Sequence, residues 1–187
     1  MNVAKTCRVA GLALLAVLAA GCSDGGDGEI AVSPEAEPYV ESLSENLSKG
    51  NESLLEVDDQ QAACIAPKWI NTMKPDRLKK AGIKPADLGT DDSDLLVGLE
   101  LTEDEGGALT DAFGDCGVDI KSSFLASDDS LDDDDRACLS EAISDDLLRE
   151  VLIVGFTKGP LAIDQQSSPG KDFFAAIATC PGATGGE

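Results

Sequence analysis

Apolar side chains recur every three or four residues over most of the chain after residue 33, which is the spacing of one helical face. The predicted helices span residues 34–49, 58–73, 75–81, 102–116, 120–124, 132–143, 144–158 and 168–180, with single helical turns at 85–88 and 94–99. The apolar run from Val151 to Val154 also suits a buried strand. Ser144 before that run and Gly159 after it favour a central helix instead. The pattern therefore predicts an all-α fold.

Polar residues at the expected positions mark where several of these helices begin. Asp58 and Gln61 have the spacing of a capping box, and so do Thr102 and Glu105. The Ser-Pro pair at residues 33–34 is typical of a cap followed by proline at the first helical position. These starts depend on residues three apart, so they can be identified without knowing the packing.

Four positions disturb the helical pattern or invite a second interpretation. Pro67 lies inside the second predicted helix, where we expect a kink or two shorter pieces near Ala66. Gly106 and Gly107 each cost a helix about 1 kcal/mol relative to alanine. Ser168 is expected to cap the last helix.

The first 22 residues have the pattern of a bacterial lipoprotein signal. Lys5 and Arg8 precede an apolar stretch at residues 9–20, and Ala-Ala-Gly then leads to Cys22. We therefore predict a signal peptide at 1–21, lipidation of Cys22, a flexible tether at 22–32, a helical domain at 33–181 and a frayed tail at 182–187. The expected location is the extracytoplasmic face of the cell membrane.

Charge narrows the range of partners. Loss of residues 1–21 would leave 12 basic and 36 acidic side chains, a net charge of −24. Such a chain repels phosphate groups, which argues against nucleic-acid binding. It also repels anionic lipid headgroups, so membrane attachment would depend on the acyl chains of the anchor.

Four cysteines remain after Cys7 and Cys22, and they allow three disulfide pairings. Residues 58–65 resemble residues 132–139 at an offset of 74, with an acidic start and an Ala-Cys pair in each. The stretch before Cys116 similarly matches the one before Cys180. A duplication into halves 58–117 and 132–181 would favour Cys64–Cys116 and Cys138–Cys180, each bridge worth about 4 kcal/mol on the chain-entropy model. The alternative is that two amphipathic helices are alike by chance.

Four segments carry a resemblance to known proteins. They are Gln61-Ala-Ala-Cys-Ile-Ala, residues 76–88, Phe113-Gly-Asp-Cys-Gly-Val-Asp and Arg136-Ala-Cys-Leu-Ser-Glu. The region 34–181 resembles uncharacterised exported proteins, often lipoproteins, of actinobacteria, and Pro67 departs from that pattern. The resemblance implies a source and a compartment but no catalytic residues.

Motifs for catalysis or metal binding are weak. The chain has no histidine, which removes Ser-His-Asp and Cys-His mechanisms. Ser168 and Lys171 match Ser-x-x-Lys, but the companion motifs of penicillin-binding proteins are missing, and a helix cap is the simpler interpretation. The aspartates at 128–135 do not fit an EF-hand and suit a solvated loop and a helix start. No cofactor or metal is therefore expected.

One segment is basic in this acidic chain. It contains Lys74, Arg77, Lys79, Lys80 and Lys84, which form a possible docking site for an acidic envelope protein or cell-wall polymer; a surface helix that balances charge is the alternative. We expect a disulfide-stapled, membrane-anchored lipoprotein that acts as a non-catalytic envelope or binding module. A divalent-cation binder and a carboxylate-based envelope enzyme are the alternatives.

Overall fold

The computed structural model describes residues 30–49, 55, 57–89, 95–128, 130–180 and 182. This part of the chain is all-α. Its helices are α1 (Glu37–Lys49), α2 (Asp59–Met73), α3 (Pro75–Lys80), α4 (Glu103–Asp115), α5 (Ile120–Ala126), α6 (Asp133–Ala142), α7 (Asp145–Lys158) and α8 (Ser168–Ala178), with short 3-10 turns η1 (Pro85–Gly89), η2 (Val97–Leu99) and η3 (Pro160–Ala162). No helix in these ranges is long and apolar enough to cross a bilayer. The predicted signal peptide, Cys22 and all but the last residues of the predicted tether lie outside the described residues.

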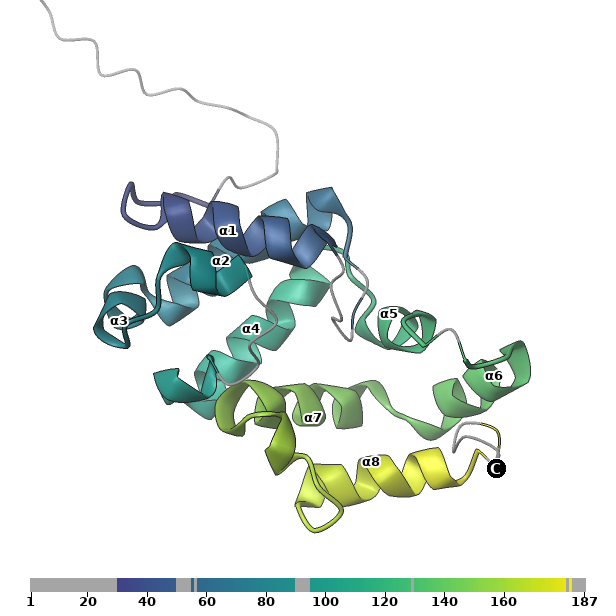
Figure 1. Cartoon of the computed structure of the whole chain (residues 1–187). Coiled ribbons are helices and arrows are strands. Elements are labelled where there is room, and N and C mark those ends of the chain that lie inside the picture. Colours follow the sequence, from purple (N-terminus) through teal and green to yellow (C-terminus); the bar gives the residue numbers. More distant parts are fainter. Residues whose placement is uncertain are drawn as a thin grey trace, which may run out of the picture.

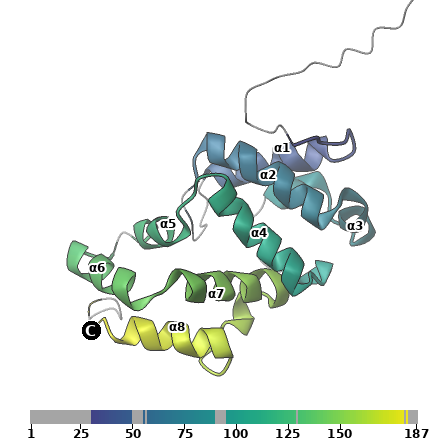
Figure 2. The ribbon, with the colours of Figure 1, turned by 180° about the vertical axis from the view of Figure 1, so that it is seen from behind.

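The helices form two packed groups that α4 connects. Helices α1 and α2 pack together at one end of the molecule with α3 beside them, and α7 and α8 lie side by side at the other end (Figures 1 and 2). Helix α4 contacts α2 in the first group and α7 in the second. The shorter α5 and α6 lie at the side, where they contact each other.

The larger core lies around α2 and α4. The predicted inner face of α2 is buried, with Ile65 and Met73 fully inaccessible to solvent. Trp69 is 7% exposed, donates from Nε1 to the Leu109 carbonyl at 2.9 Å and packs edge-to-face on the rings of Phe113 and Phe156. Trp69 is therefore a core residue. A second, smaller cluster contains Leu125, Leu131, Leu139, Ile143, Leu148 and Cys180.

Two disulfides connect the helices, with the pairing favoured by the duplication argument. Cys64 in α2 bonds Cys116 at the end of α4, and Cys138 in α6 bonds Cys180 just after α8. The Cα–Cα distances are 5.7 and 5.8 Å, within the usual range for a disulfide. Because each bridge joins two helices distant in sequence, it fixes their packing as well as closing a loop.

Most helices begin and end near the residues that the sequence predicts. The capping boxes at Asp58 and Thr102 are both formed, since each side chain accepts from the third following amide. Gly82 has a φ of +81° and closes α3: its own amide and that of Ile83 donate to the carbonyls of Lys79 and Leu78. The helical fold class and these boundaries are confirmed.

Two expectations about helix starts are wrong, and one of the two alternatives at Pro67 is excluded. Residues 34–36 form a turn, so α1 begins at Glu37 rather than at Pro34. Helix α2 continues through Pro67 as one element, which excludes two separate pieces. The cap of α8 is Ser167 rather than Ser168, because the Asp164 carboxylate accepts from the Gln166 and Ser167 amides and so turns the chain one residue earlier.

Helix α7 is central in its contacts but only partly buried. It packs against α4, α5 and α8, yet only Leu148 and Val151 on it are buried. Ala137 of α6 is exposed, and so is Phe174 of α8 at 36%. These helices surround a core too small to enclose all their apolar side chains, which periodicity alone does not show.

Candidate functional site

The predicted basic segment lies at the edge of the molecule, on α3 and its flanks (Figure 1). Lys74 connects α2 to α3 with a φ of +66°, and Pro75 directly after it begins α3. The residue before a proline avoids the helical region, so the chain turns sharply between the two helices. Lys74, Lys80 and Lys84 are exposed.

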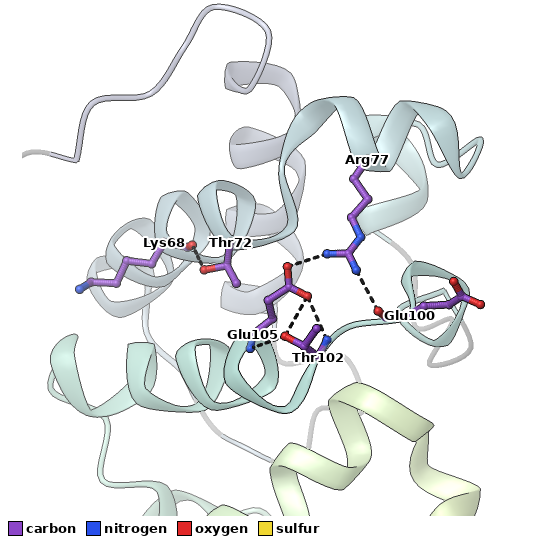
Figure 3. Close-up of polar contacts among 6 residues, drawn as sticks. All are labelled: Lys68, Thr72, Arg77, Glu100, Thr102 and Glu105. Carbon is purple, nitrogen blue, oxygen red and sulfur yellow. Dashed lines mark hydrogen bonds and ion pairs between the residues drawn. The ribbon is translucent and has the colours of Figure 1, made fainter.

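Arg77 serves a structural purpose within this segment. Its guanidinium donates to Glu105 Oε1 at 2.7 Å and to the Glu100 carbonyl at 2.9 Å, as Figure 3 shows. Glu105 also accepts from the Thr102 amide, and this bond together with the Arg77 bond lowers the pKa of the Glu105 carboxyl. Arg77 therefore holds α3 against the start of α4, and its guanidinium already has hydrogen-bond partners within the chain.

Lys79 also forms an ion pair within the chain. Its ammonium group lies 3.0 Å from a Glu35 carboxylate oxygen, and this hydrogen bond raises the pKa of Lys79. Of the twelve Lys and Arg residues from Lys49 to Lys171, seven form an ion pair with a described residue. The rest are Lys74, Lys80, Lys84, Lys158 and Lys171. Three of these five lie within eleven positions of the chain. We call Lys74, Lys80 and Lys84 the lysine strip.

A second surface, not predicted from the sequence, follows the contact between α4 and α7. Two hollows of about 480 and 680 Å³ lie there and share Asp111 and Arg149 as lining residues. Arg149 Nε and Nη2 donate to the two Asp111 carboxylate oxygens at 2.9 and 3.0 Å. This bond lowers the pKa of Asp111 and raises that of Arg149. We call this surface the α4–α7 groove.

Glycines in α4 shape this groove. A Cβ on Gly106 would lie 2.8 Å from Thr157 Cγ2, and a Cβ on Gly107 would lie 3.2 Å from an Arg149 guanidinium nitrogen. The missing side chains allow α7 to approach α4 closely and allow Arg149 to lie across the groove. Gly106, which weakens an isolated helix, is therefore favoured by the close approach of α7, and Gly107 leaves room for the Arg149 guanidinium.

The acidic residues between 128 and 135 stabilise local backbone. The Asp128 carboxylate accepts from the Ser130 amide at 2.9 Å, and Asp132 caps α6 by accepting from the Asp135 amide at 2.8 Å. No group of three or more potential ligand side chains for a metal ion occurs within the described ranges, which leave out Asp129. These contacts are those of a loop and a helix start.

The described carboxyl groups with resolved pKa shifts all shift in one direction. The pKa is lowered for Glu105, Asp111, Asp119, Asp128 and Asp164, and in each case the largest cause is a hydrogen bond to the carboxylate. A general acid for sugar hydrolysis needs the opposite shift, toward a raised pKa. Ser168, the first residue of α8, is exposed, and no hydrogen bond joins it to the exposed Lys171. None of these groups has the arrangement of a catalytic pair.

Comparison with known proteins gives no relative. No protein-family model, curated protein or solved structure matches the chain. The function is therefore argued from the chain's own geometry.

Proposed function

We propose that this chain is an exported lipoprotein domain of a bacterial envelope, related to the actinobacterial group that it resembles, and that it binds an acidic partner without catalysis. Its two disulfides indicate an oxidising, extracytoplasmic environment. The lipoprotein signal and Cys22 supply the proposed anchor. The partner would be an acidic envelope protein or cell-wall polymer.

The lysine strip is the observation that carries this proposal. The chain has 36 acidic residues, yet these three exposed lysines have no ion pair with any described residue. Exposed charges of this kind are accessible to a partner, and they raise the association rate with an acidic surface. Arg77 and Lys79 support the strip by holding α3 against α4 and the Glu35 turn.

Charge reversal of the strip tests partner binding. The variant Lys74→Glu/Lys80→Glu/Lys84→Glu leaves Arg77 and Lys79 in place, so the ion pairs of α3 remain. We expect it to lose most binding to fluorescent poly-glutamate and to partners cross-linked in the envelope fraction.

The matched control reverses three other lysines. The variant Lys49→Glu/Lys158→Glu/Lys171→Glu changes the net charge equally but leaves the strip intact. Equal loss in both variants would show that only total charge matters, and unchanged binding in the strip variant would refute the proposed role of the strip.

The anchor has a separate test. Radiolabelled palmitate is expected to mark the wild-type chain in its bacterial host and not a Cys22→Ala variant. Absence of label in the wild type would refute lipid attachment without affecting the disulfides, whose state is read by thiol alkylation of the same material.

A further inference from the structure

The α4–α7 groove has an apolar floor and charged walls. Its floor includes Val118 and Leu148, which are buried, and Ile153 and Val154, which are half-buried. Eight acidic and three basic side chains line its two hollows. The groove therefore combines a place for apolar side chains with walls that attract positive charge.

Of the three basic side chains in this groove, Arg149 is the one that lines both hollows. Arg149 makes a two-pronged bond to Asp111 at the point where the two hollows meet. Both side chains are about half exposed, at 44% and 56%, so the pair is worth at most about 1 kcal/mol. An incoming guanidinium can therefore replace Arg149 at small cost. The pair also shows that the carboxylate accepts a guanidinium through both oxygens.

Length and charge together define the occupant. The thirteen residues of α4 give the groove a length of about 20 Å, which an extended peptide of about six residues matches. Alternate side chains of such a peptide face opposite sides. Apolar residues would then contact the floor while basic residues between them reach the acidic walls.

We propose that the α4–α7 groove binds a short extended segment of a partner protein in which apolar and basic residues alternate. This site differs from the lysine strip in both its elements and the sign of its charge. The proposal therefore goes beyond the proposed function. Asp104 on α4 and Asp146 and Glu150 on α7 line the groove and form no ion pair with a described residue.

A peptide of three Leu–Arg repeats, labelled with fluorescein, is the probe. We expect it to bind the folded, disulfide-bonded domain, and a peptide of three Leu–Glu repeats not to bind. The variant Asp146→Asn/Glu150→Gln should weaken binding by about tenfold, because each of the two hollows loses one carboxylate charge on its α7 side.

The matched control is Glu37→Gln/Glu41→Gln on α1. This pair has the same spacing, also begins in the first helical turn, is exposed, and lies on α1 at the other end of the molecule from α7 (Figure 1). Binding by the control is expected within about twofold of the wild type. Equal weakening in both variants would mean attraction to net charge alone and would overturn the proposal.

Removal of Arg149 gives the sharpest test. Arg149→Gln frees the Asp111 carboxylate and should tighten binding of the Leu–Arg peptide by about fivefold. Lys80→Gln makes the same change in net charge outside the groove and should leave binding near the wild-type value. No difference between these two variants would overturn the proposal. A dimer in sedimentation that the peptide fails to dissociate would do so as well, because a second copy would then occupy the groove.

Discussion

Each of the two segments 58–117 and 132–181 contains one disulfide that joins its first and last helices, but the hydrophobic cores of the two segments differ greatly in size. Of the twenty buried residues in the cluster around α2 and α4, fourteen lie in the first half, whereas four of the six in the cluster around α6 and α8 lie in the second half, one of which is Cys180 itself. A small core supplies little burial free energy, so its stability depends more on covalent constraints. We therefore expect the Cys64–Cys116 bridge to add to the stability of an already large core, and the Cys138–Cys180 bridge to supply much of the stability of the second half.

The beginnings of the halves are nearly identical. Asp58 and Asp132 each cap a helix by accepting, at 2.8 Å, from the amide three residues later. A bonded cysteine follows each cap after six residues. This match supports the proposed duplication. The first half gains additional burial from α1, whose Tyr39 hydroxyl donates to the Ile83 carbonyl at 3.0 Å. The helix that packs before α6 is the shorter α5, whose Lys121 ammonium donates to the Ile143 carbonyl at 3.1 Å.

Removal of the second bridge is expected to have the largest effect. Cys138→Ser/Cys180→Ser opens a connection across 42 residues and should cost about 4 kcal/mol, an upper figure on the chain-entropy model. Because the local core is small, we expect hydrogen exchange in α6 and α8 to become fast while α2 and α4 stay protected.

Removal of the first bridge is the control. Cys64→Ser/Cys116→Ser should lower the unfolding midpoint as well, but α2 and α4 should keep slow exchange below that midpoint. Fast exchange throughout the domain in either variant would show that the halves unfold as one unit, contrary to the comparison.

The contact between the halves is tested by two glycines in α4. Gly106→Ala places a methyl group 2.8 Å from Thr157 Cγ2, and the Thr157 hydroxyl is held by the Ile153 carbonyl at 2.7 Å. Crowding of this kind costs about 1–3 kcal/mol, which exceeds the gain of about 1 kcal/mol in helix propensity. Gly114→Ala meets no atom within 4 Å and should stabilise the chain.

Urea denaturation measures the difference between these two variants. We expect Gly114→Ala to be more stable than Gly106→Ala by about 2 kcal/mol. Equal stability would mean that α4 and α7 separate readily, so that the halves are not held together by close packing at Gly106.

Features decided within a few residues were predictable from the sequence. The capping boxes at Asp58 and Thr102 and the closing glycine at Gly82 each depend on neighbours at fixed spacing. The disulfide pairing was also predictable, because the caps and cysteines repeat together. The start of α1 was not, since the serine at 33 and the proline at 34 suit a turn as well as a cap.

Features decided by distant contacts were not predictable. The apolar run of α7 indicates burial, but how much of it is covered depends on how α4 and α8 pack against it. Gly106 and Gly107 appear as defects of a helix until α7 is placed against them. The α4–α7 groove follows from that approach, and only the pairing of Asp111 with Arg149 reveals it.

The smallest expected effects come from the two matching caps. Asp58→Ala and Asp132→Ala each remove a side-chain bond to a helix amide and should each cost about 1 kcal/mol. If the first half carries the global stability, Asp58→Ala lowers the unfolding midpoint of the whole domain. Asp132→Ala should instead accelerate hydrogen exchange mainly in α6, because the second half opens before the first. The same global loss in both variants would contradict separate opening, and it would reduce the difference between the halves to the number of residues each one buries.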